Sequence, residues 1–193
     1  MSPARASLLT LLLAPVTALG SDLDFSTDFL DAQYSRIDPD SADAITGTSS
    51  RLSLTVSPGS WLILEREMLS RDNQDLPGRV AVEYNALLVG AGGMITDRGM
   101  WYLEGGPVTA RVSLQDTRRS VSMAAGIRTR ISPRFELGGG PRVGGVSRLD
   151  PESGEALMQI HGVFELSDQV AISGSYDYHG DDRQWRLGAR LTW

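Results

Sequence analysis

The residues best suited to chemistry form a short acidic stretch around one of the two histidines. His179 lies within three residues of Asp177, Asp181 and Asp182, and a histidine beside carboxylates could act as a general base. No serine in a recognisable nucleophile motif accompanies this stretch, and the sequence contains no cysteine. Because His-Gly-Asp-Asp also suits a polar hairpin turn, we predict no enzymatic activity and no catalytic residue.

The composition offers few residues that could bind a metal or a cofactor. The lack of cysteine excludes disulfides, cysteine-ligated zinc and iron–sulfur clusters. Acidic residues gather in two expected loops, and these are Asp38, Asp40, Asp43, Asp150, Glu152 and Glu155. Carboxylates can bind divalent cations, but this spacing does not match the twelve-position calcium loop. We interpret these residues as solvated loop charge and predict no cofactor and no bound metal.

Size and charge narrow the class of protein. The chain has 193 residues, of which 41% are hydrophobic, and this is enough for one folded domain. All 18 basic residues are arginine, yet the formal net charge is -6. Such an acidic balance argues against a nucleic-acid partner.

The first twenty residues have the three parts of a secretory signal peptide. Arg5 precedes an apolar stretch over residues 6–13, and the small residues Ala18 and Gly20 follow Pro15. The apolar stretch is about half the ~20 residues that a membrane-spanning helix requires. We therefore predict a signal peptide over residues 1–20, cleaved after Gly20, and a single domain over residues 21–193.

Beyond the signal peptide, apolar and polar residues alternate, which is the pattern of half-buried strands. The last segment is the clearest example, because Trp185, Leu187, Ala189, Leu191 and Trp193 share one face. Ten segments are strand candidates. They lie near residues 23–35, 48–57, 60–69, 79–95, 100–114, 119–131, 134–146, 155–166, 169–178 and 184–193.

The connections between these segments alternate between tight turns and longer loops. Residues 57–60, 96–99, 132–133 and 167–168 favour tight turns, whereas the other connections are mostly longer and richer in Asp and Gly. This layout is typical of an outer-membrane barrel. We predict an all-β, antiparallel up-and-down transmembrane barrel of about ten strands, with eight as the alternative and both termini on the periplasmic side.

Two segments do not keep their alternation. The apolar face of residues 100–114 changes phase near Gly106 and Pro107, so we expect a β-bulge there. In residues 60–69, either Arg66 or both Glu65 and Glu67 must face the lipid. The sequence leaves that choice open.

Alternation alone does not say which face is the interior. A soluble lipocalin-like barrel would bury Leu191 and Ile160, whereas a membrane barrel would turn them outward. Aromatic residues favour the membrane barrel, because they gather at two levels like the belts at membrane interfaces. The first level holds Phe25, Trp61, Trp101, Phe135, Phe164 and Trp193, and the second holds Tyr34, Tyr84, Tyr176, Tyr178 and Trp185.

The opposite face of the expected strands carries seven arginine and four carboxylate side chains. These residues are Glu104, Arg111, Arg128, Arg130, Arg134, Glu136, Arg142, Glu165, Asp177, Arg186 and Arg190. Arginine and carboxylate can pair bidentately across a narrow interior. We predict that they form a charge network in the lumen, with His161 as an internal hydrogen-bonding residue.

The ending RLGARLTW resembles the terminal signal strand of Gram-negative outer-membrane proteins. Gly188, Leu191 and the final Trp193 carry this resemblance. The whole expected domain is similar in pattern to small barrels of the OmpA-like or surface-antigen type, without a periplasmic domain. The resemblance implies location in the outer membrane after export, recognition of the last strand by the barrel-assembly machinery, and no inherited catalytic residue.

Four functional hypotheses follow from this pattern. The favoured one is a barrel filled by its own charged side chains, with a structural or surface-presented role and with outer-membrane lipids and lipopolysaccharide as partners. The alternative is a narrow channel for small, possibly anionic, solutes, lined by arginine. An outer-membrane enzyme and a soluble periplasmic carrier are the remaining two.

Overall fold

The computed structural model describes residues 25–39, 44–72, 79–112, 117–144, 156–179 and 182–193. The predicted signal peptide over residues 1–20 lies outside this part of the chain. So do five of the six acidic loop residues, which are Asp40, Asp43, Asp150, Glu152 and Glu155.

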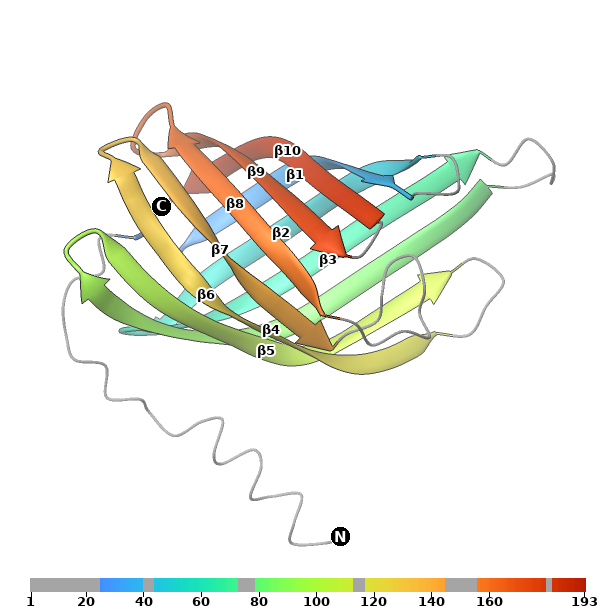
Figure 1. Ribbon diagram of the computed structural model, residues 1–193, viewed down its shortest axis with the longest axis horizontal. Coiled ribbons are helices and arrows are strands. Elements are labelled where there is room, and N and C mark those ends of the chain that lie inside the picture. The colour runs from blue at the N-terminus through green and yellow to red at the C-terminus, as the bar shows by residue number, and fades with distance from the viewer. Residues whose placement is uncertain (1–24, 40–43, 73–78, 113–116, 145–155, 180–181) are drawn as a thin grey trace, which may run out of the picture.

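Ten strands make up the described structure, and each neighbouring pair is antiparallel (Figure 1). Their bounds are β1 Phe29–Asp38, β2 Ile45–Ser57, β3 Ser60–Asp72, β4 Arg79–Thr96, β5 Gly99–Val112, β6 Arg118–Ser132, β7 Phe135–Gly144, β8 Leu157–Glu165, β9 Val170–His179 and β10 Asp182–Thr192. The strands follow one another around a closed barrel, and β1 pairs with β10. The predicted all-β antiparallel barrel is confirmed, with ten strands and not eight.

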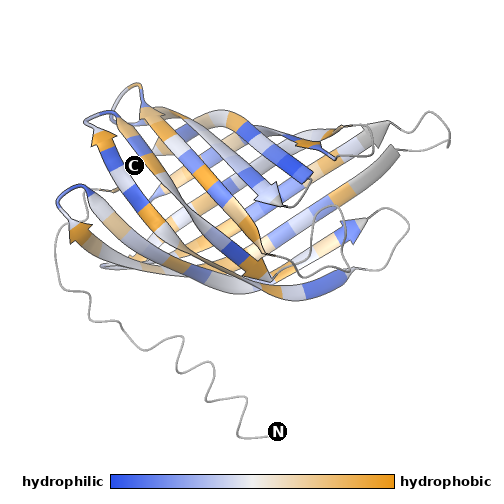
Figure 2. Ribbon diagram, in the orientation of Figure 1, coloured by the Kyte–Doolittle hydropathy of each residue, from blue (hydrophilic) through white to orange (hydrophobic). Residues whose placement is uncertain are grey.

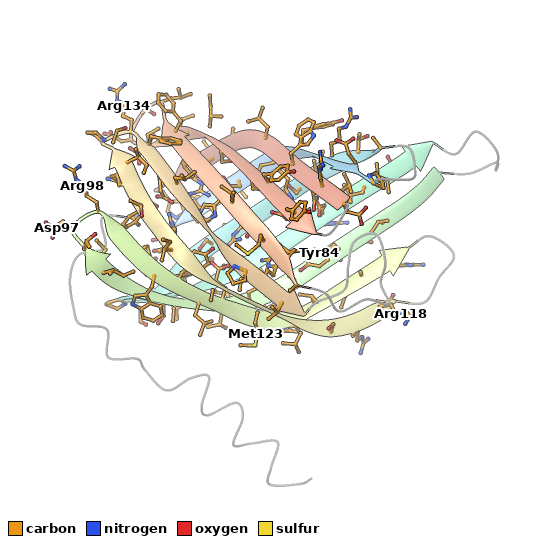
Figure 3. All side chains as sticks on the ribbon, viewed as in Figure 1. Tyr84, Asp97, Arg98, Arg118, Met123 and Arg134 are labelled. Carbon is orange, nitrogen blue, oxygen red and sulfur yellow. The ribbon has the colours of Figure 1, made fainter. Side chains whose placement is uncertain are left out.

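The tight turns all lie at one end of the barrel. Asp97, Arg98 and Arg134 mark this end in Figure 3, and Arg118 marks the opposite end. The turn between β2 and β3 contains Gly59, whose φ of 73° is costly for residues with a side chain. The C-terminus lies at the same end as the tight turns (Figure 1).

The bulge predicted at Gly106 and Pro107 is wrong. The pairs Ala86–Val108 and Val89–Gly105 belong to one continuous register between β4 and β5. An irregularity occurs instead near Met94, next to the tight turn. Since β5 keeps its phase, Val108 points into the barrel and packs there in an apolar cluster. The apolar residues that suggested a bulge are therefore interior residues.

Hydrophilic and hydrophobic residues alternate along the strands (Figure 2), and exposure shows that the two faces of the wall differ sharply in polarity. Leu191 and Ile160 are 49% and 52% exposed on the outside, whereas the side chain of Arg190 is 11% exposed. Buried polar residues occur on most strands and include Asp31, Glu67, Glu104, Arg128, Glu136, Arg142, Asp177 and Arg186. The outer face is therefore apolar, unlike the polar outer face of a soluble barrel, and the interior holds these charged groups beside the apolar cluster. Among the described residues, no helix is long and apolar enough to cross a membrane.

The prediction of two aromatic levels holds only in part. Trp101, Phe164 and Trp193 are exposed towards the tight-turn end, and Tyr34, Tyr176 and Tyr178 are exposed further along their strands. However, Phe25, Trp61 and Tyr84 are buried inside the barrel. Trp61 and Tyr84 occupy inward-facing positions of β3 and β4, so they pack in the core.

Candidate functional site: the charged interior

A cluster of two arginines and two glutamates crosses the middle of the barrel. Arg51 of β2 donates from Nη2 to both carboxylate oxygens of Glu104 on β5, at 2.7 and 2.8 Å, and from Nη1 to Glu65 of β3 at 2.8 Å. Arg142 of β7 reaches Glu65 at 3.3 Å, and Trp61 Nε1 donates to Glu104 at 3.3 Å. Because β3 and β7 lie nearly opposite each other in the barrel order, the Arg142–Glu65 pair spans the lumen.

A second cluster lies nearer the long-loop end. Arg186 of β10 donates to Asp177 of β9 at 2.9 Å and to Glu67 of β3 at 3.2 Å. Gln184 Nε2 donates to the same Glu67 oxygen at 2.7 Å, and the Ser35 hydroxyl donates to it at 2.6 Å. All five side chains belong to residues that are buried. This cluster therefore joins β1, β3, β9 and β10 from inside.

Two further pairs lie towards the tight-turn end. Arg190 donates from Nε and Nη2 to the two carboxylate oxygens of Asp31, at 2.9 and 2.7 Å. Its guanidinium lies 3.8 Å from the centre of the Phe29 ring. Arg128 binds Glu136 in the same bidentate manner, at 2.6 and 3.0 Å. Bidentate charge-assisted pairs are the strongest hydrogen bonds that these side chains form.

The segment before β1 packs against the lumen charges at this end. Phe25 is 2% exposed, and its ring lies 5.3 Å from the Arg128 guanidinium and 5.7 Å from that of Arg130. Asp28 accepts a hydrogen bond from the backbone N–H of Thr55 on β2, which ties the segment to the wall. An aromatic ring beside two cations contributes both burial and a cation–π attraction.

Little space is left between these groups. The interior cavity has a volume of about 100 Å³, and charged and aromatic side chains line it. That volume suits a few water molecules. Among the described residues, Arg51 Nε and Arg142 Nε are buried donors without a hydrogen-bond partner in the protein, and both residues line the cavity.

The structure places all but two of the predicted lumen residues on the inner face. Seven of them are the paired residues Glu104, Arg128, Glu136, Arg142, Asp177, Arg186 and Arg190. Arg130 and Glu165 form a longer contact of 3.4 Å nearer the tight-turn rim.

Arg111 and Arg134 do not lie in the lumen. Arg111 is exposed on the outer face of β5, because that strand has no bulge to turn it inward. Arg134 is exposed in the turn between β6 and β7 and points away from the barrel (Figure 3). A residue in a two-residue turn lies outside the alternation that predicts a face.

Sequence reasoning missed four lumen residues, namely Asp31, Arg51, Glu65 and Glu67. Glu65 and Glu67 point inward and Arg66 points outward, which settles the choice left open by the sequence. The alternation of Leu52 and Leu54 with Arg51 and Ser53 would have placed Arg51 on the inner face.

The structure locates the side chain of only one of the two histidines. His161 is on the inner face, with its ring 6.2 Å from that of Tyr102. Asp181 and the side chain of His179 lie outside the described residues. Asp177, the first carboxylate of that stretch, is bound to Arg186.

The three residues of the terminal pattern lie on both faces of β10. Gly188 faces inward, and a Cβ atom built on it would lie 2.0 Å from the Ala32 carbonyl oxygen of β1. Leu191 and Trp193 are exposed on the outside. On the same outer side, the rings of Tyr34 on β1 and Trp185 on β10 lie 5.7 Å apart.

No protein-family model matches the sequence, and no curated protein matches it either. Among solved structures, the NanC porin aligns with a TM-score of 0.51 and 10% identity, over 85% of this chain and 100% of that chain. This chain has the fold of a small outer-membrane β-barrel. The KdgM porin aligns with a TM-score of 0.49 and 9% identity, over 84% and 99% of the two chains. Outer membrane phospholipase A from Escherichia coli aligns at 0.42 and 11%, over 90% and 95%.

Proposed function

We propose that this protein is an integral outer-membrane barrel closed by its own side chains, with a structural or surface-presented role. The observation that carries the proposal is the Arg142–Glu65 pair, which joins β7 to β3 across the lumen. Arg51 of β2 adds further ion pairs inside the lumen, to Glu65 on β3 and to Glu104 on β5. Barrels of eight strands have interiors only wide enough for side chains, and ten strands add modest room.

The exposed apolar wall supports a location in the membrane. Large apolar side chains such as Leu187, Ile127 and Ile131 are more than half exposed on the outer face, where acyl chains would cover them. Export through a signal peptide, contact with lipopolysaccharide, and recognition of Gly188, Leu191 and Trp193 by the barrel-assembly machinery belong to the same proposal. We propose no enzymatic activity.

Conductance across a planar lipid bilayer tests the closed barrel. We expect the refolded protein to insert without steady current openings, because ion pairs occupy its lumen. Insertion is checked separately by the protection of the barrel from added protease. Steady ohmic openings of the inserted wild-type protein would overturn the proposal.

One observation favours a second candidate, a narrow channel for small anions. The interior cavity is lined by Arg51, Arg128, Arg142 and Arg190, and rings of charge select ions in pores. NanC, whose fold this chain shares, is a porin. If the protein conducts, the variants Arg128→Ala and Arg190→Ala should lower its preference for anions over cations, and an unchanged preference would count against this channel.

A further inference from the structure

A polar patch interrupts the apolar outer wall at β3 and β4. The side chain of Arg66 is 56% exposed and donates to Glu83 at 3.1 Å. Asn85 Nδ2 lies 3.5 Å from the same carboxylate oxygen. Charged groups on the lipid-facing side of a barrel are costly away from the interfaces, so this patch indicates a position near a membrane surface, where polar headgroups lie.

A groove with a volume of about 470 Å³ runs beside this patch. Its apolar side includes Leu30, Leu52, Leu64 and Leu87, which are direct cross-strand neighbours on β1 to β4. Its polar side is the next outward row, which consists of Ser50, Arg66, Asn85 and Thr109 on β2 to β5. The groove is therefore amphipathic across its width.

The polar row of the groove lies on the side expected to be extracellular. Along β3, Arg66 follows Leu64 on the way to the long-loop end, which is the extracellular end in barrels of this type. The polar row thus lies nearer the outer surface than the leucine row. The four leucines span three strand spacings, which is roughly 14 Å, and this length suits an acyl chain lying along them.

The surrounding wall is basic. Arg111 is exposed on the outer face and pairs in register with Glu83, while the exposed Arg119 of β6 is the register neighbour of Thr109. Among the described residues of this region, Arg66 and Arg111 adjoin Glu83, and Arg119 adds a third positive charge two strands away. An anionic headgroup would complement that excess of positive charge.

We propose that this groove binds one molecule of lipid A, the phosphorylated and acylated glucosamine lipid of lipopolysaccharide. An acyl chain lies along the leucine row, and a phosphate binds the guanidinium of Arg66. The hydroxyl and amide groups of Ser50, Thr109 and Asn85 suit the sugar ring, because they can hydrogen-bond its hydroxyl and amide groups. This inference rests on the proposed location in the outer membrane.

Native mass spectrometry of the full-length protein in detergent, titrated with purified lipid A, tests the site. We expect Arg66→Gln to weaken binding roughly fivefold, as expected for one cation near an anionic headgroup. The control is Arg36→Gln, because Arg36 is also exposed and paired, with Asp38 on β1, but lies outside the groove. This control should bind lipid A like the wild type. Ser50→Leu should also weaken binding, because it narrows the groove while leaving Arg66 in place.

Three further measurements separate the possible occupants. Lipid A without phosphates should bind the wild type about as weakly as lipid A binds Arg66→Gln. Equal binding by Arg66→Gln, Ser50→Leu and the wild type would overturn the proposal. Equally tight, Arg66-dependent binding of phosphatidylglycerol, or a dimer that Arg66→Gln dissociates without bound lipid, would also overturn it. Membrane fractionation of cells tests the proposed location independently, so the two failures can be told apart.

Discussion

At the scale of single residues, the barrel solves the problem of burying arginine by pairing. Arg51, Arg128, Arg142, Arg186 and Arg190 each bind a carboxylate that comes from another strand. A guanidinium presents a rigid fork that fits a carboxylate in two places. Removing one member of such a pair leaves a buried charge without its partner. This usually costs more stability than replacing both members with apolar residues.

Glu65 offers the sharpest test of this pairing, because it accepts from both Arg51 and Arg142. We expect Glu65→Gln to destabilise the barrel by about 3–5 kcal/mol, since it leaves two buried cations short of one negative charge. Urea unfolding of the protein in detergent micelles, followed by tryptophan fluorescence, measures the change.

Glu165→Gln is the matched control for that measurement. Glu165 makes a long contact of 3.4 Å with Arg130 and is 41% exposed, so its loss should cost no more than about 1 kcal/mol. Equal losses for the two variants would show that the central cluster contributes nothing beyond an exposed ion pair.

At the scale of the elements, the close approach of β10 to β1 depends on a missing side chain. A Cβ on Gly188 would lie 2.0 Å from the carbonyl oxygen of Ala32, which is backbone and cannot move aside cheaply. We expect Gly188→Ala to destabilise the barrel by about 1–3 kcal/mol through overpacking. The gel mobility of unheated samples over a temperature series measures the change.

Gly174 of β9 provides the comparison on the neighbouring strand. A Cβ there would lie 3.3 Å from the Arg186 carbonyl oxygen and 3.6 Å from Leu187. We expect Gly174→Ala to unfold within a few degrees of the wild type. A larger loss in Gly174→Ala than in Gly188→Ala would contradict the steric explanation.

The elements also show what the sequence could and could not predict. Alternation predicted the ten strands, because each strand has two unlike faces, but it did not say which face turns to the lipid. It misplaced Arg111, since Val108 and Ala110 are apolar residues that point inward, and a pattern cannot distinguish an apolar core residue from one that faces lipid. It could not predict the Arg142–Glu65 pair either, because the stagger of ten strands decides which inward side chains meet.

At the scale of the whole molecule, the outward apolar wall predicts how stability should depend on depth in the membrane. Ile160 is exposed in the middle of β8, and Val56 is exposed near the end of β2 beside a tight turn. In lipid vesicles, we expect Ile160→Arg to cost about 2–4 kcal/mol and Val56→Arg about 0–1 kcal/mol. Reversible unfolding in guanidinium measures both. Near-zero costs for both would mean that water, and not lipid, surrounds the wall.

The pairing of β1 with β10 differs from the other strand pairings of the barrel, which all join strands that are consecutive in the sequence. No short loop connects these two strands, and loop-closure entropy opposes bringing such distant segments of the chain together. The Arg190–Asp31 ion pair joins β10 to β1 on the inside of the barrel. The contact between the rings of Tyr34 and Trp185 joins the same strands on the outside. Closure of the cylinder thus relies on the backbone pairing of β1 with β10, and side chains on both surfaces of the wall hold the first and last strands of the chain together.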